Sequence, residues 1–185
     1  MLVEQTGVRA HFCQLSSAKA AQMLQRAQHD GLPVTADVTT HHLYLTEMDI
    51  GYFDANCHVL PPLRSQRDKD GLRRGLAEGT ISAICSDHQP HELDAKLAPF
   101  CESEPGVSAL DTLLPLALRL ADESSLKTSE VIARLTQQPA EILGLETGQL
   151  GVGRRADICI FDQDEHWSVD SDSLSSQGKN SPFMG

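Results

Sequence analysis

The chain has 185 residues, of which 40% are hydrophobic and 22% charged, an ordinary composition for a globular protein with one sizeable core. Its 26 acidic and 15 basic residues give a formal net charge of -11. Because no run of lysine or arginine could follow a phosphate backbone, we expect no nucleic-acid partner and no anionic membrane partner. Neither a membrane span nor a cleaved leader is expected, since no apolar run is long enough and the first residues lack a basic stretch.

The cysteines indicate the redox environment of the protein. There are five of them, an odd number, and no two form a C-x-x-C pair. Most lie in apolar or strand-like surroundings rather than in a spaced disulfide framework; they are Cys13, Cys57, Cys85, Cys101 and Cys159. This usage favours a reducing compartment, so we expect a cytoplasmic protein.

Three apolar or β-branched runs predict short strands, and two stretches with helical spacing separate them. The strands are expected at 8–15, 34–40 and 81–85, and the helices at 18–28 and 68–78. The order strand, helix, strand, helix, strand favours a parallel sheet or barrel of the α/β class. A complete (βα)8 barrel needs about 250 residues, so the chain has either a smaller fold or one portion of a larger barrel.

The second half of the chain changes to helical spacing and then to a strand-like run. Three helices and a final strand are expected at 108–120, 129–135, 139–144 and 155–162. The Gly-rich turn Gly148–Gly153 lacks the preceding strand and the lysine of a phosphate-binding loop. We therefore predict two parts: a partial barrel domain over 1–147, and the C-terminal strands of a small β subdomain with its tail over 148–185.

The motif Ser86-Asp87-His88-Gln89-Pro90-His91 directly follows the third predicted strand. It places a carboxylate and two imidazoles at the carboxyl end of a buried strand, where barrels and open α/β sheets keep their catalytic groups. Pro90 holds His91 on a rigid loop, and the arrangement is typical of a metal-assisted hydrolase. Two alternatives remain: Asp87 as a carboxylate that only stabilises the loop, and a nucleophilic triad, although the G-x-S-x-G elbow is absent.

A metal site needs further ligands beside Asp87, and the sequence supplies no ready set. Zinc requires several nitrogen, oxygen or thiolate atoms that converge on one point, yet no His-x-His or H-E-x-x-H pattern occurs. For the neighbouring His41 and His42 we prefer a structural role at a strand end, with both rings bonded to backbone or solvent. His11 and His58 are expected to be structural as well.

Several motifs, taken together and in order, resemble the second half of dihydroorotase. They are His11–Ser16, Val34–Leu43, Pro61–Ser65, Gly79–Ile81, Ser86–His91, Gln138–Ala140 and the tail Gly178–Phe183. The resemblance implies the last three strands of an amidohydrolase-type (βα)8 TIM barrel, followed by a small β appendage. It also implies a zinc-activated water that opens the cyclic amide of dihydroorotate, or the reverse ring closure. The family's His-x-His and bridging residue would lie upstream of Met1.

The resemblance assigns roles to four residues. Asp87 matches the aspartate that binds metal and shuttles the proton of the water, which makes it the implied catalytic and metal-binding residue. His91 matches a histidine that contacts substrate. Pro105 and Gly106 fall where the backbone of the family meets the pyrimidine ring, so they are implied to bind substrate too.

Two positions depart from the family pattern. Gln14 stands where the family has a metal-binding histidine, and a neutral amide is a much weaker zinc ligand than imidazole. Leu60 stands where an asparagine bonds the substrate, and leucine can neither donate nor accept that bond. The combination resembles the non-catalytic dihydroorotase homologues of some bacteria, which serve as scaffolds for aspartate carbamoyltransferase in pyrimidine biosynthesis. On this interpretation a zinc cofactor is implied only if the protein is active.

Two other functions remain possible from the sequence. One is an active zinc-dependent dihydroorotase, which the retained Asp87 and His91 favour. The other is a related cyclic amidohydrolase with a different ring as substrate; Leu60 permits it, whereas Pro61–Arg64 favours the dihydroorotase branch. Three strands would also leave an open sheet edge, so we expect the chain alone to fold poorly or to pair with a second copy.

Overall fold

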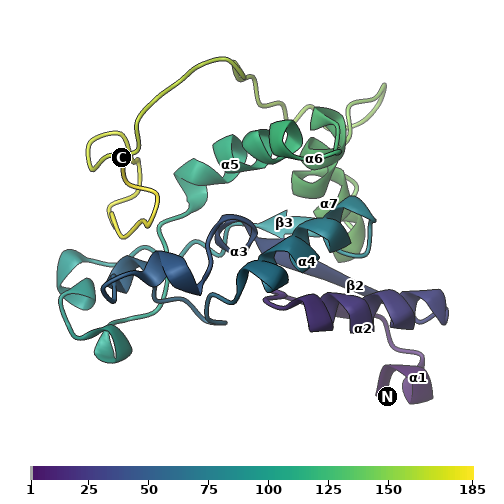
Figure 1. Cartoon of the computed structure of the whole chain (residues 1–185). Helices are drawn as coiled ribbons and strands as arrows, with labels where there is room; N and C mark the ends of the chain where they lie inside the picture. The colour runs from purple at the N-terminus through teal and green to yellow at the C-terminus, as the bar shows by residue number, and fades with distance from the viewer. Residues whose placement is uncertain (1) are drawn as a thin grey trace.

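Three parallel strands form the centre of the chain in a computed structural model that describes residues 2–185 (Figure 1). They are β1 (Ala10–Phe12), β2 (Val34–Thr39) and β3 (Ala83–Cys85). The sheet order is β1-β2-β3, with Ala10 opposite Val34 and Asp37 opposite Ala83. All three predicted strands are therefore present, each shorter than its apolar run. Parallel strands that are neighbours both in the chain and in the sheet are the pattern of successive βα units in a barrel.

Helices surround these strands, as the βα order predicts. Across residues 2–185 they are α1 (Leu2–Thr6), α2 (Ala18–His29), α3 (Thr40–Tyr44), α4 (Gln66–Ala77), α5 (Leu110–Glu123), α6 (Thr128–Leu135) and α7 (Gln137–Leu143). Short 3-10 turns lie at η1 (Glu47–Ile50), η2 (Ala55–Cys57), η3 (Leu93–Lys96) and η4 (Phe100–Glu102). Serines start the two crossover helices: the Ser17 side chain accepts from the N–H of Ala20, and Ser65 caps α4 in the same way. Within the described residues, no helix has both the length and the apolar character to cross a membrane.

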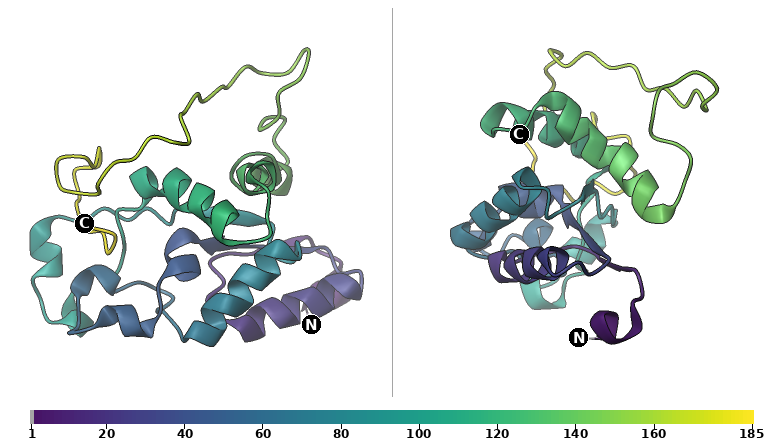
Figure 2. Two further views of the ribbon diagram at one scale, coloured as in Figure 1. Left: turned by 45° about the horizontal axis from the view of Figure 1, so that its top comes forward. Right: turned by 90° about the vertical axis from the view of Figure 1, so that its right-hand side faces the viewer.

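The helices α2 and α4 lie side by side on one face of the sheet (Figures 1 and 2). Gly71 allows this contact, because a Cβ atom there would lie 2.8 Å from the Cα of Ala18. The largest apolar cluster joins this layer to α5 and α6; its fully buried members include Val38, Leu72, Leu76, Ile81, Leu120 and Val131. The sequence therefore buries one face of the sheet under helices and leaves the carboxyl ends of the strands to polar residues.

The structure corrects the expected β appendage. Residues 155–162 form no strand, and the chain from 145 to 185 contains no helix or strand. Figure 2 shows this segment as a long irregular trace that passes α5 before it returns toward the loops. A strand needs a neighbour to satisfy its N–H and C=O groups, and no other part of residues 2–185 pairs with this run. The division into 1–147 and 148–185 stays a prediction.

Candidate active site

The carboxyl ends of β1 and β3 bring Gln14 and Asp87 into direct contact. The Nε2 of Gln14 donates a hydrogen bond of 2.6 Å to Oδ1 of Asp87. Gln89, two residues further along the loop, donates to the same oxygen at 2.8 Å. One carboxylate oxygen therefore accepts two amide N–H groups, and the glutamine at the position of the missing histidine is itself a partner of the expected metal ligand.

Both residues of this pair have a left-handed backbone. The φ angle is 57° at Gln14 and 46° at Asp87, a region that favours glycine. Such a conformation costs about 1–3 kcal/mol at a non-glycine residue and persists only where the surroundings impose it. This conformation occurs after two strands, at residues whose side chains contact each other across the end of β2. It therefore marks this edge of the sheet as the candidate site.

The structure also brings together the predicted substrate-binding residues. The ring of His91 lies with Nε2 3.0 Å from the carbonyl oxygen of Pro105. Gly106 has a φ of 136°, and a Cβ atom there would come within 3.0 Å of the same Nε2. Its N–H donates to the carbonyl of His58 at 2.8 Å. Glycine is thus required where the chain passes close to the His91 ring.

Asn180, which was not among the predicted site residues, connects the loop after β3 to the C-terminal tail. Its Oδ1 accepts the N–H of His91 at 2.7 Å, and its Nδ2 donates to the carbonyls of Gln89 and Gly106, each at 3.0 Å. The residue is only 5% exposed. The tail motif around Asn180 carried part of the resemblance, so the signal was present, but its spacing does not reveal which loop it contacts.

His88 has a structural role in the same loop. Its Nδ1 lies 3.1 Å from the backbone nitrogens of both Ala109 and Leu110, at the start of α5. Because Nδ1 accepts these bonds, the proton of the neutral ring is on Nε2. The imidazole acts as a helix cap, which leaves it unavailable as the base of a nucleophilic triad.

The residues around Asp87 do not fit a zinc centre. The donors that contact its carboxylate are two neutral amides, and Leu60, 58% exposed, brings no polar atom to the site. Across residues 2–185, one group of three ligand-type side chains has its atoms within 4.8 Å of one another, and that group does not include Asp87. We therefore derive no reaction step through a metal at this position.

The pair His41 and His42 forms part of the short helix α3, which corrects the expected strand end. Thr39 caps this helix, and its Oγ1 lies 2.7 Å from Nδ1 of His42. The other nitrogen of His42 faces the carbonyl of Pro62 at 3.4 Å, so this ring bonds as expected. His41 is 1% exposed, and neither of its ring nitrogens has a hydrogen-bond partner in the described part of the chain.

Replacing His41 with leucine is expected to make the protein less sensitive to acid. Burial, with the neighbouring His42 as a smaller cause, lowers the pKa of His41 from 6.5 to about 3. Between pH 6.5 and 3 the unfolded chain therefore binds a proton at His41, whereas the folded chain does not. This contribution to stability is complete above pH 6.5 and is lost progressively as the pH falls toward 3.

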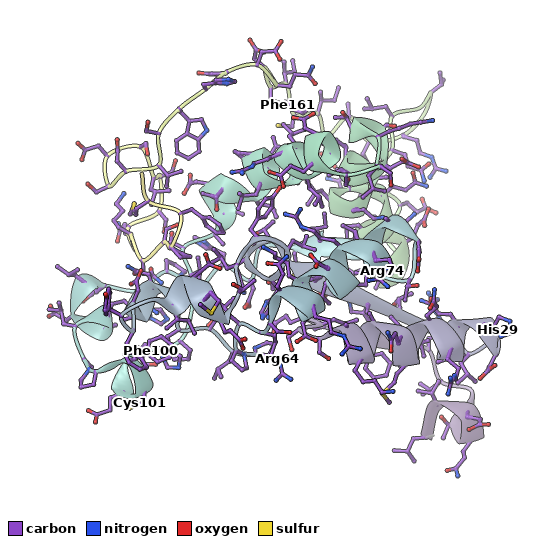
Figure 3. The ribbon with its side chains drawn as sticks, viewed as in Figure 1. His29, Arg64, Arg74, Phe100, Cys101 and Phe161 are labelled. Carbon is purple, nitrogen blue, oxygen red and sulfur yellow. The ribbon has the colours of Figure 1, made fainter. Side chains whose placement is uncertain are left out.

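Urea midpoints measured at intervals across this pH range test the expectation. The free energy of unfolding should fall less steeply with acid in His41→Leu than in the parent. His29→Leu is the matched control for the change from imidazole to leucine, because the His29 ring is 87% exposed at the end of α2 (Figure 3). Equal slopes in the parent and His41→Leu would contradict the role of His41.

The parallel strands, the crossover helices and the carboxylate after β3 define a portion of an amidohydrolase-type barrel. A family model described as "Amidohydrolase family" matches residues 2–184. The chain therefore belongs to the amidohydrolase family.

Several similar sequences are named as dihydroorotases or as dihydroorotase-like proteins. The chain is 49% identical over 185 residues to a "Dihydroorotase-like protein" of Pseudomonas putida, and 46% identical to one of Pseudomonas aeruginosa. It is 40% identical to a "Dihydroorotase" of Syntrophus aciditrophicus. These alignments cover 100% of this chain and 43%, 44% and 43% of the relatives. The chain thus spans less than half the length of the relatives it matches, and the expected family is confirmed.

Several solved structures that resemble the chain are hydantoinases. The L-hydantoinase (dihydropyrimidinase) from Arthrobacter aurescens gives a TM-score of 0.91 at 27% identity, covering 100% of this chain and 42% of that one. A D-hydantoinase (dihydropyrimidinase) from a Thermus species gives a TM-score of 0.87 at 22% identity and shows the fold alone. The expected barrel architecture is confirmed by these likenesses.

Proposed function

We propose that the chain is part of a non-catalytic dihydroorotase-like protein of pyrimidine biosynthesis that supports the assembly of aspartate carbamoyltransferase. The observation that carries the first half of this proposal is the hydrogen bond from Gln14 to Asp87. An amide that donates to the carboxylate stands where the family places a metal-binding imidazole.

The chemistry of that contact explains why activity is not expected. Metal-assisted hydrolysis needs a carboxylate whose lone pairs are open to a cation and to the proton of the attacking water. Here Oδ1 of Asp87 already accepts the amides of Gln14 and Gln89. An amide N–H group cannot ligate a cation, and a metal ion at Oδ1 would have to displace both donors. Leu60 adds no group that could hold the substrate amide.

The partner half of the proposal has a different support. The resemblance to non-catalytic homologues implies a scaffold for aspartate carbamoyltransferase, and the relatives from two Pseudomonas species carry the name dihydroorotase-like. The helical layer keeps a well-packed core in which Leu72 and Leu76 are 1% and 0% exposed. A barrel that retains its outer helices while its mouth loses ligands is suited to binding through its outer surface.

The full-length protein tests both halves. Dihydroorotate hydrolysis and the reverse cyclisation of carbamoyl-aspartate are expected to stay at the rate of a blank without protein. In size-exclusion chromatography, aspartate carbamoyltransferase from the same organism is expected to elute in a larger complex when the protein is present. Turnover that Asp87→Ala abolishes would overturn the non-catalytic half, and separate elution would overturn the partner half.

An active cyclic amidohydrolase is the second candidate, favoured by the retention of Asp87 and His91 on one loop. It predicts turnover of dihydroorotate, or of a hydantoin or dihydrouracil ring if the substrate differs. The matched pair of variants is Asp87→Ala and Asp164→Ala, since Asp164 is exposed on the C-terminal segment. Loss of turnover in the first variant alone would favour this candidate.

A further inference from the structure

A second polar cluster lies between β1 and β2, beside the pair of Gln14 and Asp87. His11, Cys13 and Asp37 each offer one ligand atom, and these atoms all lie within 4.8 Å of one another. Cys13 is exposed and His11 half-buried, whereas Asp37 is buried at 9% exposure. No role in the proposed function uses these three side chains.

The strand register explains why they converge. His11 is opposite Thr35 in the parallel pair, and alternate residues of a strand point to the same face. Thr35 and Asp37 therefore share one face of β2, while Val34 and Ala36 on the other face pack into a buried cluster with α2. The ring of His11 reaches Asp37 directly, with Nε2 2.9 Å from Oδ2.

Neighbouring groups hold the atoms of the cluster that face away from its centre. Nδ1 of His11 lies 2.8 Å from the hydroxyl of Thr35. Oδ1 of Asp37 accepts the backbone N–H of Gln14 at 2.7 Å and the thiol of Cys85 at 3.2 Å. Because Nδ1 of His11 and Oδ1 of Asp37 are held in this way, the other two atoms, Nε2 and Oδ2, face each other at 2.9 Å. Ligand side chains in metal sites are oriented by outer partners of this kind.

A divalent cation would balance the charge of the two acidic groups of the cluster, the Cys13 thiol and the Asp37 carboxylate. The thiolate and the Asp37 carboxylate would repel each other if both were ionised, and a divalent ion between them removes that repulsion.

We propose that His11, Cys13 and Asp37 form a mononuclear site for a zinc-class divalent cation. One imidazole nitrogen, one thiolate and one carboxylate oxygen match the ligands that zinc takes, whereas magnesium and calcium prefer oxygen alone. On binding, the Cys13 thiol loses its proton to solvent, and the proton on Nε2 of His11 moves to Nδ1, where it donates to Thr35. Each ion bound therefore releases one proton, and a solvent molecule completes the fourth position.

Cobalt(II) gives a direct test, because it occupies zinc sites and a thiolate ligand produces a charge-transfer band in the near ultraviolet. The full-length protein, stripped with a chelator and reduced, is titrated with cobalt(II) chloride and then with zinc chloride. We expect a saturable band at one cobalt per chain, which zinc abolishes. Absence of the band, or a band that zinc leaves unchanged, would overturn the proposal.

Variants locate the ion. Cys13→Ser should lose the band; the residue is exposed, and serine has nearly the same shape as cysteine. Cys101→Ser should keep the band, since Cys101 lies on η4 away from the strands (Figure 3). Thr35→Val should keep the band but weaken cobalt binding by about tenfold or more through the lost orientation of His11. Asp87→Asn should leave binding unchanged, which separates this site from the one in the proposed function. Retention of the band in Cys13→Ser, or its loss in Asp87→Asn, would refute the assignment.

Discussion

Replacing Asn180 with alanine is expected to lower the free energy of unfolding by about 2–4 kcal/mol. The variant removes an acceptor from the N–H of His91 and a donor from the carbonyls of Gln89 and Gly106. Buried polar groups left without a partner cost about 1–3 kcal/mol each, and water entering the space offsets part of that cost. Chemical denaturation measures the loss, and limited proteolysis should cut the C-terminal tail sooner than in the parent.

Two further variants show whether the side-chain bonds of Asn180 are the cause. Asn180→Asp keeps the acceptor for the N–H of His91 but places a carboxylate oxygen against two carbonyl oxygens. It should therefore lower the free energy of unfolding at least as much as Asn180→Ala does. Asn56→Ala is the matched control, since only its backbone N–H takes part in a described hydrogen bond, and a change within about 0.5 kcal/mol is expected. If Asn180→Ala leaves the free energy of unfolding unchanged, the contacts of the tail do not stabilise the loop.

The sequence predicted the strands because their signal is local. The β-branched run that became β2 and the short apolar run before Asp87 are both strands in the structure, and a helix connects each strand to the next. The run over 155–162 has the same local character, yet it forms no strand because no segment of residues 2–185 pairs with it. Local propensity therefore predicts which segments are able to pair, while the available neighbours decide whether they do.

The candidate site was predictable in part. The motif after β3 identified Asp87 from its place at a strand end, and the resemblance placed Gln14 where the family has a metal-binding histidine. That Gln14 would turn its amide toward Asp87 depends on a left-handed backbone at both residues, which no spacing reveals. The contacts of Asn180 span about ninety positions of sequence, and only the folded loops bring it to His91.

Replacing Gln14 with histidine is expected to create a zinc-binding pair with Asp87 in the full-length protein. Zinc lies about 2.0–2.2 Å from its nitrogen and oxygen ligands, which puts two such atoms about 3.3–3.6 Å apart in a tetrahedral site. Gln14 Nε2 already lies 2.6 Å from Oδ1 of Asp87, so an imidazole at this position reaches the required distance after a small adjustment. Since losing even an outer partner of a metal ligand weakens binding about 10- to 100-fold, adding a ligand should strengthen zinc binding by at least about tenfold.

The comparison is made in a Cys13→Ser background, so that the proposed site of His11, Cys13 and Asp37 does not contribute. Equilibrium dialysis against zinc is carried out on Gln14→His and on Gln14→Ala, which removes the amide donor without adding an imidazole. Stronger binding in the histidine variant alone would mean that the mouth of the barrel keeps the geometry of a metal centre and lacks one ligand. Equal zinc binding in the two variants would contradict the expectation. It would mean that an imidazole at position 14 is not enough to restore a metal centre with Asp87, so that further ligands are missing.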